Sequence, residues 1–304
     1  MQNVHAHAWD QSLHLAPETV REAEISRGFP FDLTVRIEEF VADNAPFDKV
    51  VVFGMKARLA GIWTHLQAPE DGGRSTAQVE AFSRVTAALE AAGLDVGPRH
   101  LAASGSLVLG DAAGLDGVRP GLATYGLMPD ELLERELPDR AALTPILSLN
   151  ARPIRVAELP AGTGISYGPT FTTSRPSRIA TLPIGYGDGW SRALSNRASA
   201  LVRGMRVPLV GNVAMDAVMA DVTDVPGPPV TVDDEFVLIG EQGPERISVS
   251  EVARARGTNS WEVVTSLAAR LPRVYHAASV PREIRTLVGD EVRDEIGSRR
   301  SMRP

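Results

Sequence analysis

The chain has 304 residues, of which 43% are apolar and 23% charged, an ordinary composition for a soluble protein with more than one folded domain. Its net charge of -7 argues against nucleic acid as a partner, because phosphate binding needs a basic face. The absence of cysteine excludes disulfides, thiolate nucleophiles and zinc–thiolate sites. No apolar run reaches membrane-spanning length and residues 1–7 lack a signal-peptide pattern, so we expect a cytoplasmic protein that binds no membrane.

Residues 1–48 form an N-terminal segment to which no motif can be assigned. Residues 17–24 have helical composition, and residues 31–37 alternate like a strand. His5, His7 and His14 could chelate a metal, but no carboxylate lies at matching ligand spacing. We therefore expect a frayed polar terminus and no metal site.

Between residues 49 and 144, strand patterns alternate with helix patterns. The runs 50–53, 58–65, 100–104 and 118–125 read as strands or strand-to-loop units, and 106–109 as helical. A longer helix is predicted to start at Ser75, which forms a capping box with Gln78, and to stop at Gly93. Such an alternation favours βα units of a parallel sheet or barrel.

Near Pro145 the pattern changes to short strands, which we expect to build a separate β domain over residues 145–290. Its strands are predicted at 146–149, 154–159, 178–184, 200–202, 207–210, 217–222 and 235–239, separated by glycine or proline turns. Two helices close the domain, capped by Ser248 and Asn259, with Gly257 between them. The charged residues 291–304 are expected to form a mobile tail.

One tyrosine stands out because small and turn-forming residues surround it, in the stretch GTGISYGPTFT at residues 162–172. Tyr167 is therefore predicted to be presented on a loop. A phenol loses its proton near pH 10, so it acts as a base at neutral pH only where cations stabilise the phenolate. From this stretch alone, an ordinary loop tyrosine flanked by glycines explains the pattern equally well.

The sequence motifs around Tyr167 resemble those of a known family. GISYG at 164–168, PIGYGDGWSR at 183–192 and VGNVAMD at 210–216 closely resemble three signature stretches of the alanine racemase C-terminal domain. Upstream, GIWTHL at 61–66, HLAAS at 100–104 and VRPGLATYG at 118–126 look like that family's later barrel strands. The resemblance is collinear from about residue 61 to about residue 275. It implies an α/β plus β fold: a partial (β/α) TIM-type barrel followed by an alanine-racemase-like β domain.

The same resemblance implies a pyridoxal 5'-phosphate (PLP) enzyme that interconverts L-alanine and D-alanine, the D-alanine serving peptidoglycan. Arg119 matches the arginine that hydrogen-bonds the cofactor's pyridine nitrogen, and His65 matches the histidine that orients this arginine. Ser104, Gly121 and Leu122 match the cradle of the cofactor phosphate. Taken singly, each of these residues also fits a purely structural role.

On the substrate side, Tyr167 matches the family's catalytic tyrosine, which acts from the neighbouring subunit and so implies a homodimer. Tyr186 matches a tyrosine at the substrate entrance. Met215 lies where a backbone amide of the family holds the substrate carboxylate, although a core methionine would fit the sequence as well.

The chain departs from the family at the cofactor lysine. The family's N-terminal sequence motif that contains the cofactor lysine is absent, and the only lysines in the sequence are Lys49 and Lys56. The interval before His65 is also too short for the first half of an eight-stranded barrel, which needs about 200 residues or more in total. We therefore expect an N-terminally truncated relative of alanine racemase that is impaired on its own.

Two alternatives stay open at this level. The chain could be a non-catalytic subunit or interaction module that pairs with an intact racemase and lends it Tyr167, or a truncated product without function. PLP-dependent decarboxylases share the barrel-plus-β architecture. The tyrosine word and the word NVAMD at 212–216 favour a racemase.

Overall fold

The chain folds as two compact units, Met1–Thr144 and Pro145–Pro304. The computed structural model describes residues 23–25, 33–35, 61–110, 115–135, 143–277, 280–287, 289–293 and 299–302. The expectations for His5, His7 and His14, for Lys49 and Lys56, and for the strand at 50–53 lie outside these residues.

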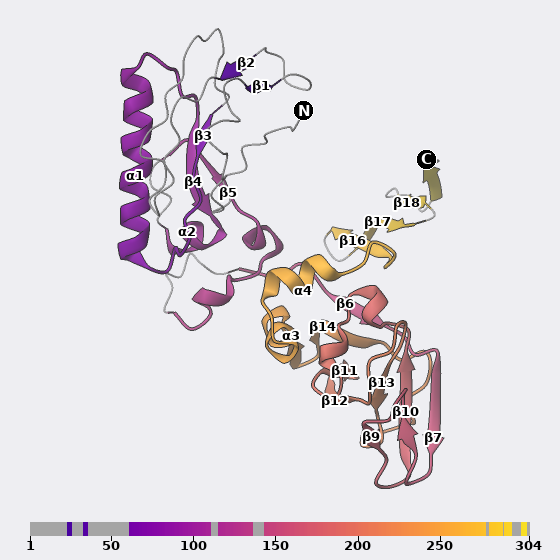
Figure 1. The fold of residues 1–304 in the computed structure, drawn as a ribbon. Helices are drawn as coiled ribbons and strands as arrows, with labels where there is room; N and C mark the ends of the chain where they lie inside the picture. Colours follow the sequence, from indigo (N-terminus) through magenta and orange to yellow (C-terminus); the bar gives the residue numbers. More distant parts are fainter. Residues whose placement is uncertain are drawn as a thin grey trace. The chain divides into compact units, whose positions relative to one another are not determined.

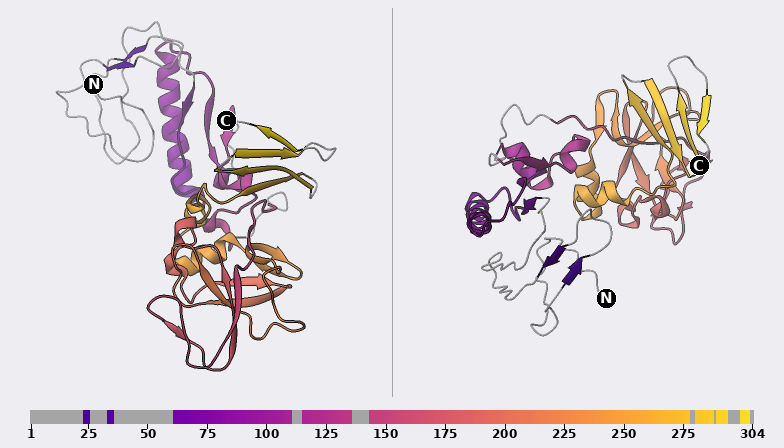
Figure 2. Two further views of the ribbon diagram at one scale, coloured as in Figure 1. Left: turned by 90° about the vertical axis from the view of Figure 1, so that its right-hand side faces the viewer. Right: turned by 90° about the horizontal axis from the view of Figure 1, so that it is seen from above.

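The first unit is built on a parallel three-stranded sheet in the order β3-β4-β5. Its longest helix, α1, runs beside these strands (Figures 1 and 2). An antiparallel pair, β1-β2, precedes them. The elements are β1 (Ala23–Ile25), β2 (Leu33–Val35), β3 (Ile62–Trp63), α1 (Gly72–Ala91), β4 (Arg99–Ala103), α2 (Ser104–Leu109), β5 (Gly117–Arg119) and the 3-10 helices η1 (Leu122–Tyr125) and η2 (Asp130–Leu132).

Helix α1 starts earlier than its sequence predicts, and the Ser75 capping box is wrong. Asp71 is the N-cap, and its side chain accepts a hydrogen bond from the Arg74 amide at 3.1 Å. Gln78 instead ties the helix to the segment after β3: its Oε1 accepts from the Gln67 amide at 2.9 Å and its Nε2 donates to the His65 carbonyl at 3.3 Å. The helix therefore fixes the backbone at the end of β3.

A small apolar core joins α1 to the sheet. Phe82 from α1 packs with Leu66, Leu101 and Ala102, and Ile62, Val79 and Leu115 border this cluster. Val79 and Phe82 are three residues apart, so one face of the helix covers the strands. Gly93, with φ +82°, follows the end of the helix as its sequence indicates.

The second unit is a mostly β domain. Its main sheet has the strand order β15-β14-β11-β12-β13-β10-β7, with β6 also paired to β14. The elements are β6 (Leu149–Ala151), β7 (Arg155–Leu159), β8 (Gly164–Ile165), β9 (Phe171–Thr172), β10 (Ser177–Leu182), η4 (Tyr186–Asp188), η5 (Arg192–Leu194), β11 (Ser199–Val202), β12 (Met205–Val210), β13 (Val218–Asp221), β14 (Phe236–Gln242), β15 (Glu245–Ile247), α3 (Val249–Arg256), α4 (Ser260–Ser266), β16 (Arg273–Ala277), β17 (Val280–Thr286), β18 (Gly289–Arg293) and β19 (Arg299–Met302).

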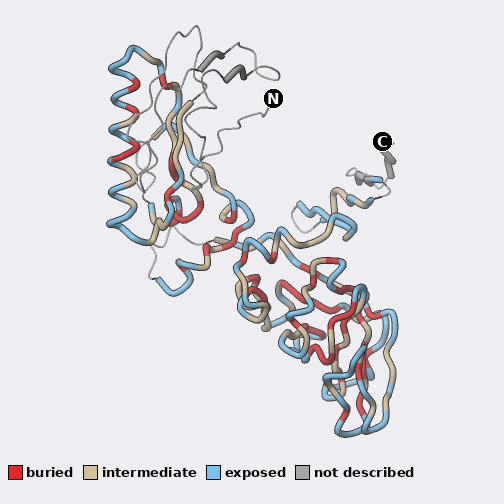
Figure 3. Tube along the Cα trace, in the orientation of Figure 1, coloured by how far each residue is buried: buried red, intermediate tan, exposed pale blue. Residues whose placement is uncertain are grey.

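Buried residues concentrate in the central strands of this sheet (Figure 3). In β14, Phe236, Val237, Leu238 and Ile239 are all buried, so this strand is covered on both faces. Trp190, between η4 and η5, is 2% exposed and belongs to the same core. The segment that carries Tyr186 is therefore anchored by its neighbour.

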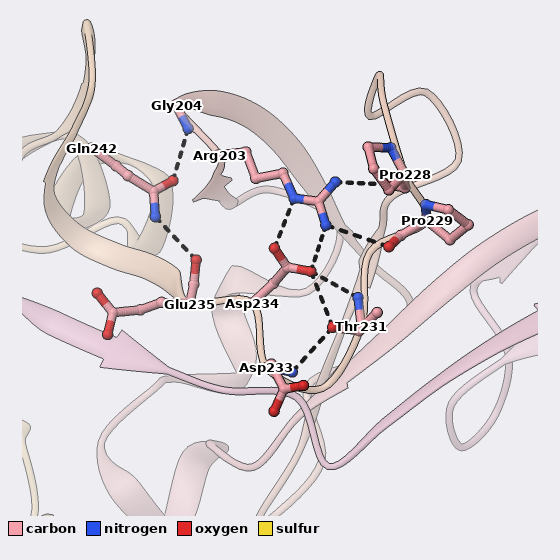
Figure 4. A network of polar contacts seen from close by, with 9 residues as sticks. All are labelled: Arg203, Gly204, Pro228, Pro229, Thr231, Asp233, Asp234, Glu235 and Gln242. Carbon is pink, nitrogen blue, oxygen red and sulfur yellow. Dashed lines mark hydrogen bonds and ion pairs between the residues drawn. The ribbon is translucent and has the colours of Figure 1, made fainter.

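A two-residue turn closes the β11–β12 hairpin, and an ion pair joins this turn to the segment before β14. Val202 pairs with Met205, so Arg203 and Gly204 form the turn, and their φ values of +51° and +73° fit a type I′ turn. The Arg203 guanidinium grips Asp234 through two hydrogen bonds of 2.7 and 2.8 Å and donates to the carbonyls of Pro228 and Pro229 (Figure 4). This clamp offsets the strain of a non-glycine residue at positive φ.

The predicted fold class, barrel-type βα units followed by a β domain, is confirmed. Ser248 and Asn259 cap α3 and α4 as expected. The strand predicted at 146–149 is displaced to Leu149–Ala151, and β8, β9, β15, β16 and β17 were not predicted. Strand β1 begins at Ala23, where the composition of residues 17–24 indicated a helix. The segment expected as a tail, 291–304, contains the end of β18 and β19, which pair with each other. No helix among the described residues is long and apolar enough to cross a membrane.

Replacing Asp234 by Asn should weaken the second unit in a pH-dependent way. Arg203 holds the pKa of the Asp234 carboxyl below its ordinary value, so the pair's stabilisation is present above about pH 4 and is lost as pH falls through the lowered pKa. We expect D234N to lower the urea midpoint most at pH 7, and the difference from wild type to close as the pH falls below about 4.

The matched control is Asp224→Asn. Asp224 pairs with Arg175 at 2.6 Å, but both side chains are more than half exposed, so water screens the pair and the urea midpoint should not change. Equal midpoints for D234N and wild type at pH 7 would contradict the role given to the clamp.

Candidate active site

The predicted residues of the first unit gather at the carboxyl ends of the parallel strands. His65 follows β3, Ser104 follows β4, and Arg119 is the last residue of β5, with Gly121 two positions further on. Parallel strands direct their carboxyl ends to one edge, which is where α/β proteins place their sites. The sheet thus explains why residues more than 50 positions apart meet.

Arg119 is the centre of this group. Its Nη2 donates to the Thr64 carbonyl at 2.7 Å and lies 3.3 Å from His65 Nδ1. Its Nη1 donates to the His100 carbonyl at 3.2 Å and makes a short contact with His100 Nδ1. The guanidinium carbon lies 4.6 Å from the centre of the Trp63 ring, a cation–π contact.

These contacts define the protonation of both histidines. A guanidinium carries only donors, so Nδ1 of His65 and of His100 must accept, which leaves each ring neutral with its proton on Nε2. Burial, and after it the charge of Arg119, lowers the pKa of both histidines; burial also lowers the pKa of Arg119 itself. No carboxylate of the described residues pairs with Arg119, so neutral acceptors alone hold this half-buried cation.

Ser104 organises a second set of donors beside this cluster. Its hydroxyl is buried and accepts from the amides of Gly121 and Ala123 at 2.9 and 3.1 Å. Leu122, between them, buries its side chain, and its amide makes no hydrogen bond to the described residues. Among the described residues, the Ser104 O–H and the Leu122 amide are therefore the donors left at this turn, and a hydroxyl beside a backbone amide suits a small dianion.

Trp63, Thr64 and His100 also belong to this site, although the sequence did not predict them as site residues. Trp63 and His100 are register partners in the β3–β4 pair, and their rings stack with a 4° interplanar angle and centres 6.4 Å apart. All three stand inside quoted motif words. That these three residues surround Arg119 follows from the strand register, which cannot be read from the sequence alone.

In the second unit, Tyr167 is presented as its flanking residues predict. It lies in the turn between β8 and β9, with 79% of its surface exposed. Its hydroxyl makes no hydrogen bond to any residue in the described part of the chain. The backbone is held nevertheless: Asn212 Nδ2 donates to the carbonyls of Tyr167 and Gly168 at 2.9 and 3.0 Å.

The main chain brings Tyr186 and Met215 side by side. The amide of Tyr186 donates to the Ala214 carbonyl at 3.0 Å, and that of Gly187 donates to the Met215 carbonyl at 2.8 Å. At Gly185 a Cβ would lie 2.3 Å from the Ala214 carbonyl oxygen, so only glycine permits this approach. Met215 is 59% exposed, so the reading of it as a core methionine is wrong.

The buried carboxylate of Asp188 stabilises the turn that carries Tyr186. Asp188 is 6% exposed and accepts from the Gly185 amide at 2.9 Å and from Arg270 Nε at 2.6 Å. On the open side, Tyr186 lines a cavity of about 450 Å³. The other lining residues are Gly189, Ser191, Arg192, Arg256 and Ser266.

The predicted residues thus form two groups, one on each compact unit. His65, Arg119, Ser104 and Gly121 are brought together in the first unit, with Leu122 beside them. Tyr167, Tyr186 and Met215 are joined through residues 211–216 in the second. The fold and these groups define a class of protein in which barrel-type βα units precede a β domain that carries an exposed tyrosine.

Comparison with known proteins narrows this class. The family model "Alanine racemase, N-terminal domain" matches residues 51–129, and "Alanine racemase, C-terminal domain" matches residues 146–275. The alanine racemase of Desulfosudis oleivorans is 43% identical over 217 residues, covering 71% of this chain and 54% of that protein. The alanine racemase of Desulfovibrio desulfuricans is 41% identical over 236 residues, covering 77% and 61%.

Solved structures agree. Alanine racemase from Bacillus anthracis with bound L-Ala-P aligns with a TM-score of 0.69 and 33% identity, covering 74% of this chain and 57% of that one. Alanine racemase from Bartonella henselae with covalently bound pyridoxal phosphate aligns with a TM-score of 0.59 and 32% identity, covering 70% and 55%. The chain belongs to the alanine racemase family. It spans little more than half the length of the curated relatives it matches.

Arg119→Gln should raise the pKa of both His65 and His100, because it removes the neighbouring positive charge. Both values should stay below about 6.5, since burial is the larger cause of the lowering and persists in the variant. Titration of the imidazole ring protons by NMR measures the change. Arg99→Gln is the control, because Arg99 pairs with Glu90 and Asp116 and should leave both histidines near their wild-type values. Identical titration curves for R119Q and wild type would refute the coupling.

Proposed function

We propose that this chain is part of a PLP-dependent racemase acting on alanine. The observation that carries the proposal is the half-buried Arg119 guanidinium, held between neutral His65 and His100 beside the Ser104 hydroxyl and its two amides. The alanine racemase names of its relatives support the same substrate class.

The chemistry of the first unit fits a pyridine ring and a phosphate. Within the described residues, the four polar contacts of Arg119 use only its terminal nitrogens, so its Nε–H is available to donate to a ring nitrogen. A guanidinium does not give up its proton, so that ring nitrogen would remain unprotonated. The hydroxyl of Ser104 and the amide of Leu122 would hold the phosphate. When bound, PLP supplies the electron sink that acidifies the Cα–H of an amino acid.

Tyr167 would exchange a proton at the substrate Cα, working in the site of a neighbouring copy. Its phenol stands 79% exposed, and no described residue of its own chain binds its hydroxyl. A phenol needs nearby cations to act as a base, and the cations of the first unit of a second copy could meet that need. We therefore propose a homodimer, with Tyr186 and Met215 bordering the substrate next to Tyr167.

A second candidate is a non-catalytic subunit that lends Tyr167 to an intact racemase. Tyr167 favours this candidate, because its ring is exposed and its backbone is held by hydrogen bonds. Lys49 and Lys56 favour it as well, because neither lies in the family's lysine motif. The two candidates differ in whether the chain alone turns over alanine.

Both candidates require Tyr167 to act in the site of a partner subunit, and a mixing experiment tests this role. The chain is combined with a full-length alanine racemase whose own catalytic tyrosine has been replaced by phenylalanine, and D-alanine formation is measured. Mixed dimers should restore activity, because Tyr167 would complete the partner's site. The same mixture with Tyr167→Phe should stay at the background level. Restored activity with Y167F would show that Tyr167 is not the group supplied.

The chain alone should bind PLP weakly and racemise alanine negligibly, because neither lysine stands in the family's motif and catalytic groups misplaced by about 1 Å lose about 100-fold in rate. Borohydride reduction in the presence of PLP, followed by peptide mapping, decides the point. A stoichiometric pyridoxyl adduct on Lys49 or Lys56, with turnover by the chain alone, would overturn this expectation and exclude the non-catalytic candidate.

A further inference from the structure

One asparagine connects the Tyr167 turn to the segment that carries Met215. The Asn212 side-chain amide donates from a single nitrogen to two successive carbonyls, those of Tyr167 at 2.9 Å and Gly168 at 3.0 Å. In return, the Ser166 hydroxyl donates to the Asn212 carbonyl at 2.6 Å. Three hydrogen bonds therefore join two turns that are 45 residues apart in sequence.

The backbone on both sides of Asn212 is held in place by hydrogen bonds. On one side of it, the Gly211 amide donates to Asn196 Oδ1 at 2.6 Å; on the other, the Val213 amide donates to Ser195 Oγ at 3.0 Å. At Gly211, which has φ +78°, a Cβ would come within 2.8 Å of the Ile165 carbonyl oxygen. The two turns thus abut so closely that the second cannot shift without moving the first.

The tyrosine ring has no comparable support of its own. It is largely exposed, and its hydroxyl has no partner in the described part of the chain. The direction of the ring is then set by the backbone at Tyr167. Ser166, with φ +64°, holds this backbone in the left-handed region that non-glycine residues rarely adopt, so an outside contact is needed to keep it there.

We propose that Asn212 is the positioning residue of Tyr167: its amide fixes the backbone turn from which the phenol projects, so that the ring meets the neighbouring site in one orientation. The catalytic meaning of this assignment rests on the proposed function. The clamp itself does not, because it can be tested in the chain alone.

Asparagine is suited to this task because it offers an N–H donor in a side chain short enough to lie against two carbonyls. An aspartate of the same shape has no donor when ionised and would repel both carbonyl oxygens. Asn212→Asp is therefore the sharpest variant, since it changes the chemistry with almost no change of volume. Ser166→Ala removes the reciprocal bond from the opposite side and leaves Asn212 intact.

The control is an asparagine-to-aspartate substitution at a position where the side chain only accepts a hydrogen bond. Asn259 caps α4 by accepting from the Glu262 amide at 2.9 Å, and aspartate accepts equally well at an N-cap. N259D should therefore leave Tyr167 unaffected.

The experiment uses the chain labelled with 3-fluorotyrosine. The sequence contains only 4 tyrosines, so four fluorine resonances are expected, and the loss of one in Tyr167→Phe assigns Tyr167. In N212D the Tyr167 resonance should move and broaden, while the resonances of Tyr125 and Tyr275 stay in place. S166A should change the same resonance in the same direction by a smaller amount, and N259D should change none.

A Tyr167 resonance unchanged in position and width in N212D would overturn the proposal. So would an equal change in N259D, or changes at Tyr125 and Tyr275 as large as that at Tyr167, because the effect would then not be local. If N212D fails to fold, S166A decides: a selective change at Tyr167 supports the clamp, and no change refutes it.

Activity separates this proposal from the proposed function. In the mixed dimers with the tyrosine-deficient racemase, N212D should lower kcat by about 100-fold with little change in KM, because a misplaced base weakens only the chemical step. Selective spectral changes with no activity even for the wild-type chain would refute the proposed function and leave the positioning role standing. Wild-type kcat in N212D would refute the positioning role.

Discussion

The site of the first unit depends on one half-buried cation that no carboxylate of the described residues neutralises. Arg119 is held by the carbonyls of Thr64 and His100, by two imidazole nitrogens and by the face of Trp63. Removing a charge from water is costly unless polar groups replace the hydration shell, and these neutral acceptors do so without cancelling the charge. The result is a fixed positive group whose neighbouring histidines are kept neutral.

This arrangement follows from the sheet. Three short parallel strands bring the carbonyls of Thr64 and His100 within hydrogen-bond distance of Arg119, and Gln78 of α1 holds the backbone after β3 through the His65 carbonyl. A carboxylate in place of either histidine would pair with Arg119 and offset the charge that the proposed site uses. The second unit works by another means. There the exposed tyrosine is placed by backbone contacts at residues 211–216 and by the buried Asp188.

Local structure was predictable where a single residue type determines the backbone conformation. The glycines around Tyr167 predicted its exposure, and Ser248 and Asn259 predicted the starts of α3 and α4. Prediction failed where two residues could take the same role. Asp71 caps α1, and Ser75 lies inside the helix, where its hydroxyl donates to the Ala68 carbonyl.

The contacts around the site were beyond prediction for a different reason. Trp63 and His100 surround Arg119 only because of the β3–β4 register, and Asn212 reaches Tyr167 across 45 residues of sequence. Both Asn212 and His100 were inside motif words that we quoted, but a word shows neither the partner of a side chain nor its direction. The register of parallel strands and the meeting of distant turns are set by packing of the whole unit.

The most direct test of the account is the binding of pyridoxine 5'-phosphate, which keeps the ring nitrogen and the phosphate but lacks the aldehyde, so that no lysine is needed. Calorimetry would compare the wild-type chain with R119Q, S104A and the N259D control. The account predicts that wild type and N259D bind this ligand equally, and that R119Q and S104A each bind it at least about 10-fold more weakly, the loss expected from about 1.4 kcal/mol or one charge-assisted hydrogen bond. Unchanged affinity in either site variant, or no binding by the wild-type chain, would contradict the claim that Arg119 and Ser104 form a ring-and-phosphate site.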